Sequence, residues 1–475
     1  MGDIRYVCLS DMHLGAETSL LTNLQIASDQ PDPKEPSPVL IQLVTCLRHL
    51  VSKNQHAGTK PTLILNGDIL EFALAYDNQA LSAFQRFVDL ILPKDDPLFG
   101  RIIYIPGNHD HHFWEVARET QYFESYLSTL AWTDEPARPW HTTNIFSKTV
   151  PSYSLNRLVR RLPHLKDMTI ETAYPNFGLL REDRKKCMIF HHGHFLESMY
   201  TLVSSLISML FPGRPEPLNV WDMEEENFAW IDFFWGALGR SGEAGKGVGA
   251  IYEKLQNPKQ VKQLLANLAR GLARKHDLPG WGDTMEAKLV EWAFNQVAER
   301  VRSFERSQPE KALSEDTETG LWAYMQGPLS RQIMGEYGDK IPASVTFVFG
   351  HTHKPFEQDM NFSGYSGWVD VYNTGGWVVD KDQRQPLCGA AVILIDENLE
   401  ATSLRMYNEA EHEADYRVTV REARHPGDQP GPFQTYIEGL VQEAPAVFGD
   451  FSAAAARAVN VRAQNLRARI RSQGF

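Results

Sequence analysis

The chain has 475 residues, of which 43% are hydrophobic, and 60 acidic against 47 basic side chains give a net charge of −13. This length exceeds the usual size of one domain, so we expect a main domain with substantial additions. The negative charge argues against general electrostatic attraction to nucleic acid, although it leaves room for a local basic patch.

The four cysteines (Cys8, Cys46, Cys187 and Cys388) are scattered and show no pair spacing typical of a metal site. At least Cys8 and Cys187 lie inside apolar runs, so buried free thiols are expected. The sequence shows no basic-then-apolar N-terminal segment and no apolar run of membrane-spanning length. We therefore expect a soluble cytoplasmic protein, with peripheral membrane contact left open.

The first part of the chain alternates short apolar runs with segments of helical periodicity. Bounded apolar runs predict buried strands, and apolar residues spaced three and four apart predict helices. Strands are predicted at 5–10, 62–65, 101–105 and 186–190, and helices at 39–51, 78–92 and 113–130. This alternation predicts a largely parallel sheet covered by helices.

From Phe195 to about Lys340 the sequence changes to helical patterns. Residues 195–211 predict an amphipathic helix, and further helices are predicted to begin at Pro258 and Asp283. The polar and acidic stretch 307–320 predicts a loop. Strand character returns at 344–350, 369–372 and 390–395, so 194–340 is predicted to be an all-helical insertion within a sheet domain. After 425–427 a linker leads to a helical C-terminal tail that carries five arginines: Arg457, Arg462, Arg467, Arg469 and Arg471.

Polar side chains follow several of the predicted strands. Asp11 and His13 end the first strand two positions apart, so they point to the same side. They lie at the strand's carboxyl end, where open α/β sheets bind ligands. Asp68, Asn108-His109, His192 and the pair His351 and His353 follow later strands, beside glycines that allow close backbone approach. Mixed carboxylate, amide and imidazole ligands suit manganese, iron, zinc or similar divalent ions.

Five blocks in this order resemble the calcineurin-like metallophosphoesterase superfamily. The blocks are Asp11-Met12-His13, Gly67-Asp68, Gly107-Asn108-His109-Asp110, His192-Gly193 and Gly350-His351-Thr352-His353. The resemblance covers roughly 1–193 and 341–408, and Asn373-Thr374-Gly375 is similar to a segment near the end of that family's domain. It implies a four-layer α/β/β/α sandwich. We expect a core in two parts (1–193 and 341–410), the helical insertion (194–340), and a linker with a helical tail (411–475).

The resemblance also implies roles for the residues of these blocks. Asp11, His13 and His353 would bind a first metal ion. Asn108, His192 and His351 would bind a second, and Asp68 would bridge the two. His109 would lie beside the leaving group without binding metal, and Asp110 is the candidate that orients its imidazole. His194 stays open as an alternative to His192, and Glu71 is either a partner of the ligands or a surface carboxylate.

The implied activity is hydrolysis of a phosphoester with two divalent ions, manganese first, with iron, zinc or a mixed pair as alternatives. Hydroxide activated by the metals would attack phosphorus in line with the departing oxygen. The run Gly67-Asp68-Ile69-Leu70-Glu71 disfavours the phosphoprotein phosphatase branch. It looks more like the UDP-2,3-diacylglucosamine pyrophosphatase branch, where helices between the last two blocks cover acyl chains. The expected substrate is therefore a phosphodiester or pyrophosphate. Because the 195–211 segment is amphipathic, lipid-linked molecules are included among the expected substrates.

The sequence leaves two other hypotheses about function open. A nuclease or nucleotide phosphodiesterase would use five basic residues of the insertion: Lys259, Lys262, Arg270, Arg274 and Lys275. A catalytically inert binding module would be expected to lack some of the ligands, and here all are present. Metal content and the response to salt would separate these readings. The sequence leaves the oligomeric state undetermined.

Overall fold

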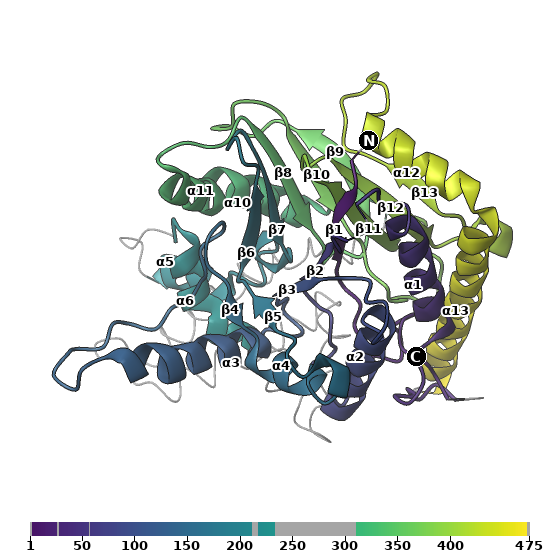
Figure 1. Ribbon diagram of the computed structural model, residues 1–475, viewed down its shortest axis with the longest axis horizontal. Helices are drawn as coiled ribbons and strands as arrows, with labels where there is room; N and C mark the ends of the chain where they lie inside the picture. The colour runs from purple at the N-terminus through teal and green to yellow at the C-terminus, as the bar shows by residue number, and fades with distance from the viewer. Residues whose placement is uncertain (1, 26–27, 57, 211–216, 233–309, 473–475) are drawn as a thin grey trace, which may run out of the picture.

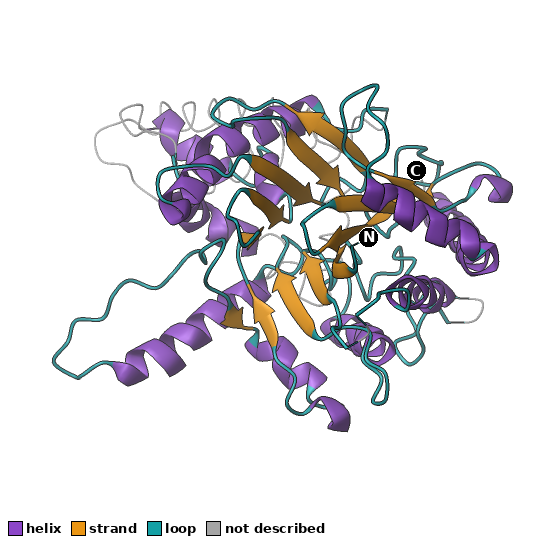
Figure 2. Ribbon diagram, turned by 45° about the horizontal axis from the view of Figure 1, so that its top comes forward, coloured by secondary structure: helices purple, strands orange, loops and turns teal. Residues whose placement is uncertain are grey.

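The computed structural model describes residues 2–25, 28–56, 58–210, 217–232 and 310–472. Within these ranges the strands form two sheets that lie face to face, with helices on both outer sides (Figure 1, Figure 2). This mixed α/β architecture is the one expected from the sequence.

The first sheet joins its described strands in the order β13-β12-β11-β1-β2-β3-β5-β4. The strands are β1 (Ile4–Leu9), β2 (Thr62–Asn66), β3 (Arg101–Ile105), β4 (Val150–Pro151), β5 (Ile170–Thr172), β11 (Gly389–Asp396), β12 (Ala401–Asn408) and β13 (Thr419–Arg421). β1, β2, β3 and β5 run parallel, whereas β4 and β11 to β13 are antiparallel to their neighbours. The predicted parallel arrangement therefore holds for the centre of this sheet.

The second sheet has the order β6-β7-β8-β10-β9 among the described strands. Its strands are β6 (Asn176–Leu180), β7 (Lys186–His191), β8 (Ser344–Phe349), β9 (Phe356–Met360) and β10 (Val369–Asn373). β7, β8 and β10 are parallel, with β6 and β9 antiparallel at the edges. The seven strands predicted from apolar runs are all present, and each ends within one residue of its prediction. The sequence did not predict the other described strands (β4, β5, β6, β9, β12 and β13), because they lack such runs.

Helices cover the outer face of each sheet. Against the first sheet lie α1 (Pro38–Val51), α2 (Asp77–Ile91), α4 (Tyr153–Val159), α12 (Pro432–Glu443) and α13 (Pro445–Ser472). Against the second lie α10 (Glu315–Tyr324) and α11 (Ser330–Tyr337), while α3 (His112–Thr120) and α6 (Val220–Ile231) bury residues in the same apolar cluster and α5 (Leu202–Leu210) packs on α6. A third cluster, which includes Cys8, Ile64, Phe190 and Val348, fills the space between the sheets. The three clusters account for the four layers, because each helical layer buries one apolar face and each sheet buries two.

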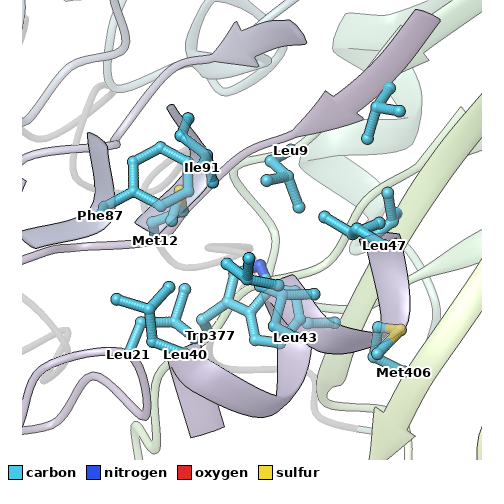
Figure 3. Close-up of a cluster of buried hydrophobic side chains, with 14 of the residues drawn as sticks. Leu9, Met12, Leu21, Leu40, Leu43, Leu47, Phe87, Ile91, Trp377 and Met406 are labelled. Carbon is cyan, nitrogen blue, oxygen red and sulfur yellow. The ribbon is translucent and has the colours of Figure 1, made fainter. Parts of the chain in front are cut away.

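The largest apolar cluster lies between the first sheet and its helices. In Figure 3, Leu40, Leu43 and Leu47 of α1 project from one helix face toward Leu9 of β1 and Trp377. α1 begins at Ser37, whose hydroxyl oxygen accepts a hydrogen bond from the Leu40 amide at 3.0 Å. α13 packs along α1, as the yellow and purple helices of Figure 1 show. The C-terminal tail is thus part of this core.

The helix predicted at 195–211 is wrong at its start, because α5 begins only at Leu202. Before it, Gly193 has a φ of +124° and His194–Leu196 form a short 3-10 turn. Phe195, Leu196 and Met199 are at most 4% exposed and pack in the same cluster as α10. Burial on several sides of this segment, and not an amphipathic helix, explains its apolar residues.

The loop predicted at 307–320 is also wrong over its second half, where α10 begins at Glu315. Ser314 caps this helix, since its hydroxyl accepts from the Thr317 amide at 3.1 Å. The acidic residues of the first turn favour a helix N-terminus because of the helix dipole. The acidity that indicated a loop is therefore a helix-start signal.

The described parts of residues 194–340 contain helices and turns but no strand. The helices predicted from Pro258 and Asp283 lie outside the described residues, as do the five basic residues of the nuclease reading. Of the helices that are described, none is long and apolar enough to cross a membrane.

Candidate metal centre

The residues of the five sequence blocks meet where the strands of both sheets end. Asp11 and His13 follow β1, Asp68 follows β2, and Asn108 follows β3 in the first sheet. In the second sheet, His192 follows β7, while His351 and His353 follow β8. The centre therefore lies at the carboxyl ends of parallel strands, with each sheet supplying part of it.

Five of these residues have a backbone conformation that side chains rarely adopt. The φ angles are +48° at Asp11, +45° at His13, +51° at Asp68, +69° at His351 and +59° at His353. Among the other described non-glycine residues, only Arg184, Asp339 and Leu399 have positive φ. Such strain persists only where surrounding structure enforces it, and it concentrates at functional sites.

Two glycines of the sequence blocks make room for the carboxylates. A Cβ atom at Gly107 would overlap the side chain of Asp68, and one at Gly350 would overlap that of Asp11. The Asn373-Thr374-Gly375 segment supports Gly350, because the side-chain amide of Asn373 donates to the Gly350 carbonyl at 2.9 Å. This packing gives the glycines and the asparagine of the blocks a structural reason.

Asp11, His13 and His353 form one cluster, which we call the first half of the centre. The Nε2 atoms of His13 and His353 are 3.3 Å apart, and His353 Nε2 lies 3.5 Å from Asp11 Oδ1. Asp11 is held in place by the His351 amide, which donates to both of its carboxylate oxygens at 3.0 and 3.1 Å. The two sheets are thus joined through the Asp11 carboxylate.

Asn108, His192 and His351 form the second half, and Asp68 stands between the halves. His192 Nε2 lies 3.1 Å from Asn108 Oδ1, 3.3 Å from His351 Nδ1 and 3.3 Å from Asp68 Oδ2. Asp68 Oδ2 is also 3.7 Å from His13 Nε2 of the first half. The structure therefore brings all seven predicted metal-binding side chains into one buried cluster, with Asp68 in the position of a shared ligand.

The hydrogen bonds at the rim of the cluster show that its residues fit cations. His13 Nδ1 lies 2.7 Å from Glu71 Oε2, and His353 Nδ1 lies 2.6 Å from Asp380 Oδ2. Donation of these Nδ1 protons outward leaves the Nε2 lone pairs facing each other and the carboxylates. Lone pairs at such distances repel unless a cation lies between them, which is the usual arrangement of metal-binding imidazoles. Such hard oxygen and imidazole donors suit divalent ions.

Glu71 connects the first half to His109. Its Oε1 lies 2.8 Å from His109 Nδ1, while its Oε2 contacts His13, and the residue is 1% exposed. Burial opposes ionisation, but His109 and His13 outweigh it and lower the pKa of Glu71 below its ordinary value. Glu71 is therefore a partner of the candidate ligands, and the alternative prediction of a surface carboxylate is wrong.

The expectation that Asp110 orients the His109 imidazole is wrong. The carboxylate of Asp110 accepts from the backbone amides of Gly107 at 2.6 Å, Ile69 at 2.8 Å and Leu70 at 3.2 Å. It joins the loops after β2 and β3, whereas Glu71 contacts the imidazole. Sequence adjacency favoured Asp110, but the turn at His109 points the two side chains to different partners.

The charges of the centre are strongly coupled. Burial disfavours the Asp68 carboxylate, but His192, His109 and His13 more than compensate and hold its pKa well below the ordinary value. Burial likewise opposes the charged form of His192, yet Asp68 and Asp11 raise its pKa to about 9. The cluster therefore stabilises positive charge at its centre, as a cation site requires.

The structure places His192, and not His194, in the cluster. His194 Nε2 lies 3.0 Å from the Tyr174 hydroxyl, which donates to Glu224 Oε2 of α6 at 3.0 Å. The other oxygen of Glu224 lies 3.0 Å from His111 Nε2, and Glu224 is 1% exposed. A buried polar network thus attaches α6 to the loops behind the second half.

Several residues around the centre were not found from the sequence. Asp380 contacts His353, Asn66 contributes a carbonyl 3.2 Å from His192 Nδ1, and Glu197 Oε1 lies 3.5 Å from His351 Nε2. Glu224 belongs with them. No spacing motif marks these positions, because their partners are far away in the sequence. Among the residues that contact the candidate ligands, Glu71 had a sequence signal, because it is an acidic residue three positions after Asp68.

The loops that carry Asp11, His13, Asp68, Asn108 and His192, at the ends of β1, β2, β3 and β7, lie within the part of the chain that the comparison with protein families identifies. Residues 4–202 match the family model described as calcineurin-like phosphoesterase. The enzymes of this family are metal-dependent hydrolases of phosphoester bonds. Over these residues the chain is similar to this family of metal-dependent phosphoesterases. The match ends before His351 and His353, which the fold brings into the same cluster. A search among curated proteins gives no match for the chain.

Proposed function

We propose that this protein hydrolyses a phosphodiester or a pyrophosphate with two divalent metal ions. Asp11, His13 and His353 bind the first ion, while Asn108, His192 and His351 bind the second. Asp68 bridges them. The observation that carries the proposal is the convergence of inward-facing Nε2 and carboxylate atoms from both sheets, with the outer nitrogens of His13 and His353 bonded to carboxylates.

When bound, the two ions would acidify water and neutralise charge on the phosphoryl oxygens. We propose manganese as the ion, with iron, zinc or a mixed pair as alternatives. The residues of the chain fix the positions of these charges before substrate arrives. Their rigidity comes from burial, since Asp11, Asp68 and His192 are at most 2% exposed. Such preorganised charge acts without further rearrangement during the reaction.

His109 supplies the proton for the leaving oxygen in this proposal. Its Nδ1–H donates to Glu71, so Nε2 faces Asp68, at 3.9 Å from Oδ2. The Glu71 carboxylate stabilises the charged imidazolium, which holds a proton at Nε2. A substrate oxygen that leaves beside His109 would receive that proton. Glu71 acts through His109 and His13 and is a positioning residue.

The proposed preference for a diester or pyrophosphate rests on the sequence blocks rather than on the geometry of a bound substrate. The run after Asp68 departs from the phosphoprotein phosphatase pattern Gly-Asp-x-x-Asp-Arg-Gly, because Glu71 stands at the second aspartate and Phe72 at the arginine. A lipid-linked substrate is the finer form of this proposal. The amphipathic helix predicted at 195–211 favoured a lipid-linked substrate. The buried residues of this segment instead indicate that it packs into the protein core.

The test is a screen of the purified protein with added Mn²⁺ against paired substrates. These are a chromogenic monoester, a chromogenic diester, a soluble pyrophosphate and a lipid-linked pyrophosphate. We expect the diester or the pyrophosphates to be cleaved faster than the monoester. Asp68→Asn should reduce the rate roughly 10³-fold or more, because it removes charge at the centre of the reaction.

Asp183→Asn is the matched control, because Asp183 is an exposed carboxylate of the β6–β7 turn, away from the centre. It should leave the rate unchanged. A wild-type protein that carries no metal and cleaves none of these substrates would overturn the proposal. Faster cleavage of the monoester would overturn the substrate preference alone.

A further inference from the structure

Arg462 of the C-terminal helix α13 is buried against the loop that follows β1. It is 7% exposed, and it is one of the five arginines of the predicted helical tail. Its guanidinium donates to the Ser19 carbonyl at 3.1 Å and to the Thr22 carbonyl at 2.6 Å. The desolvation that comes with burial lowers the pKa of Arg462 to about 10. A buried cation is costly, so its placement on two loop carbonyls requires an explanation.

Both loop residues also bind the backbone beside the metal ligands. The Ser19 hydroxyl donates to the Met12 carbonyl at 2.7 Å, and Met12 lies between Asp11 and His13. The Thr22 hydroxyl accepts from the Gly15 amide at 2.9 Å. Arg462 is therefore connected by two short hydrogen-bond paths to the segment in which Asp11 and His13 have positive φ.

α13 makes a second contact with the support of the same half. Arg467 donates to the Asp382 carbonyl at 2.6 Å, two residues beyond Asp380, which contacts His353. The segment before Asp380 pairs with the loop under Arg462, since the Leu20 amide donates to the Trp377 carbonyl at 2.7 Å. The backbone amide of Trp377 in turn donates to the Asp11 carbonyl at 3.0 Å.

These contacts reach the backbone beside Asp11 and His13 and, through the segment of Asp380, the imidazole of His353. The described residues of the second half are instead bordered by Glu197 and by the network around Glu224. Loss of an α13 contact should therefore act on one half of the centre. A helix that merely filled the core would affect both halves equally.

We propose that α13 is a positioning element of the metal centre, and that Arg462 is the positioning residue through which it holds the first half in its strained conformation. This inference rests on the proposed dinuclear site and assigns to the C-terminal helix, outside the matched family domain, a part in metal binding. The arginine-bearing tail then supports the ligands through Arg462.

The test compares Arg462→Met and Thr22→Val with Arg457→Met in the full-length protein. Arg457 is exposed on the same helix, so it controls for the loss of one arginine from α13. Each variant is titrated with Mn²⁺, and the metal retained after desalting is counted. We expect both test variants to bind one of the two equivalents about 10-fold more weakly, in the range seen for residues that orient ligands. The second equivalent and the control should match wild type.

The half affected is identified with His353→Ala and His192→Ala. Added to His353→Ala, Thr22→Val should weaken metal binding no further, whereas added to His192→Ala it should weaken the remaining equivalent by the same factor of about 10. Thr22→Val keeps the shape of the side chain, so it carries the test if Arg462→Met does not fold. Equal weakening of both equivalents, or none, would overturn the inference. A wild type without metal would instead overturn the proposed function.

Discussion

The two halves of the candidate metal centre differ in what supports them beyond the strand ends that carry their residues. The first half is bordered by α13 and the loops it contacts, which carry Arg462 and Asp380. The second half is bordered by Glu197, which precedes α5, and by the network around Glu224 of α6. In Figure 1, α13 lies at the right of the sheets and α5 and α6 lie at the left. Separate additions to the chain therefore support separate ligands.

The chemistry of the two supports also differs. Arg462 binds neutral carbonyl groups, and its charge does not change near neutral pH because its pKa is about 10. Glu224 binds an imidazole and a phenol. Burial lowers the pKa of His111, but Glu224 outweighs this effect and raises it above the ordinary value. The support of the second half should therefore depend on pH, and that of the first half should not.

Removal of metal should have the largest effect on stability, because it acts on both halves together. An ion present at 100 times its Kd adds about 2.7 kcal/mol to the free energy of unfolding. Chelation should therefore lower the melting temperature, and added Mn²⁺ should restore it. Thermal unfolding of the metal-free and reloaded protein measures this. An identical melting temperature with and without metal would contradict the dinuclear centre.

Glu71→Gln should reduce kcat by about 10- to 100-fold, since Glu71 contacts both His13 and His109. The glutamine cannot accept from both imidazoles and also stabilise the charged form of His109. Steady-state kinetics with the best substrate of the screen measures the loss. Glu182→Gln is the control, because Glu182 is exposed in the β6–β7 turn. A normal kcat for Glu71→Gln would remove Glu71 from the mechanism.

Glu224→Gln should destabilise the protein by about 2 kcal/mol at about pH 6, as expected for a hydrogen bond to a charged group. A histidine whose folded pKa is raised contributes stability that is complete below its unfolded pKa of about 6.5 and is lost as pH rises through the folded value. The difference between wild type and variant should therefore shrink by about pH 9. Urea unfolding at both pH values checks the sign.

Glu225→Gln is the control for Glu224, because Glu225 is the neighbouring residue and pairs with Arg138 on the surface. Its effect should stay below about 1 kcal/mol at either pH. A difference for Glu224→Gln that grows toward pH 9 would show that the pair with His111 does not support this half.

Arg467→Met should have the smallest effect, because the side chain of Arg467 is 47% exposed. Loss of its bonds to the Asp382 carbonyl should cost at most about 1 kcal/mol. Mn²⁺ titration should show a weaker first half, by less than Arg462→Met produces. A larger effect than that of Arg462→Met would place the main contact of α13 on the Asp380 segment.

The sequence by itself determined the core strands, the order of the blocks and the seven residues that meet at the centre. These were predictable because each ligand directly follows an apolar run, and parallel strands bring their carboxyl ends together. His192 could not be separated from His194 in this way, since both follow the same strand. The direction of each side chain depends on the turn at Gly193, which only the structure shows.

Tertiary structure alone decided which groups support the ligands. Glu71 was chosen over Asp110 by the turn at His109, and Asp380, Glu224 and Arg462 reach the centre from distant parts of the chain. Their side chains carry no local pattern, because a buried charge is recognised by its partners and not by its neighbours in sequence. The candidate ligands can therefore be predicted from the amino-acid sequence. The contacts that hold them in strained conformations exist only once the chain has folded.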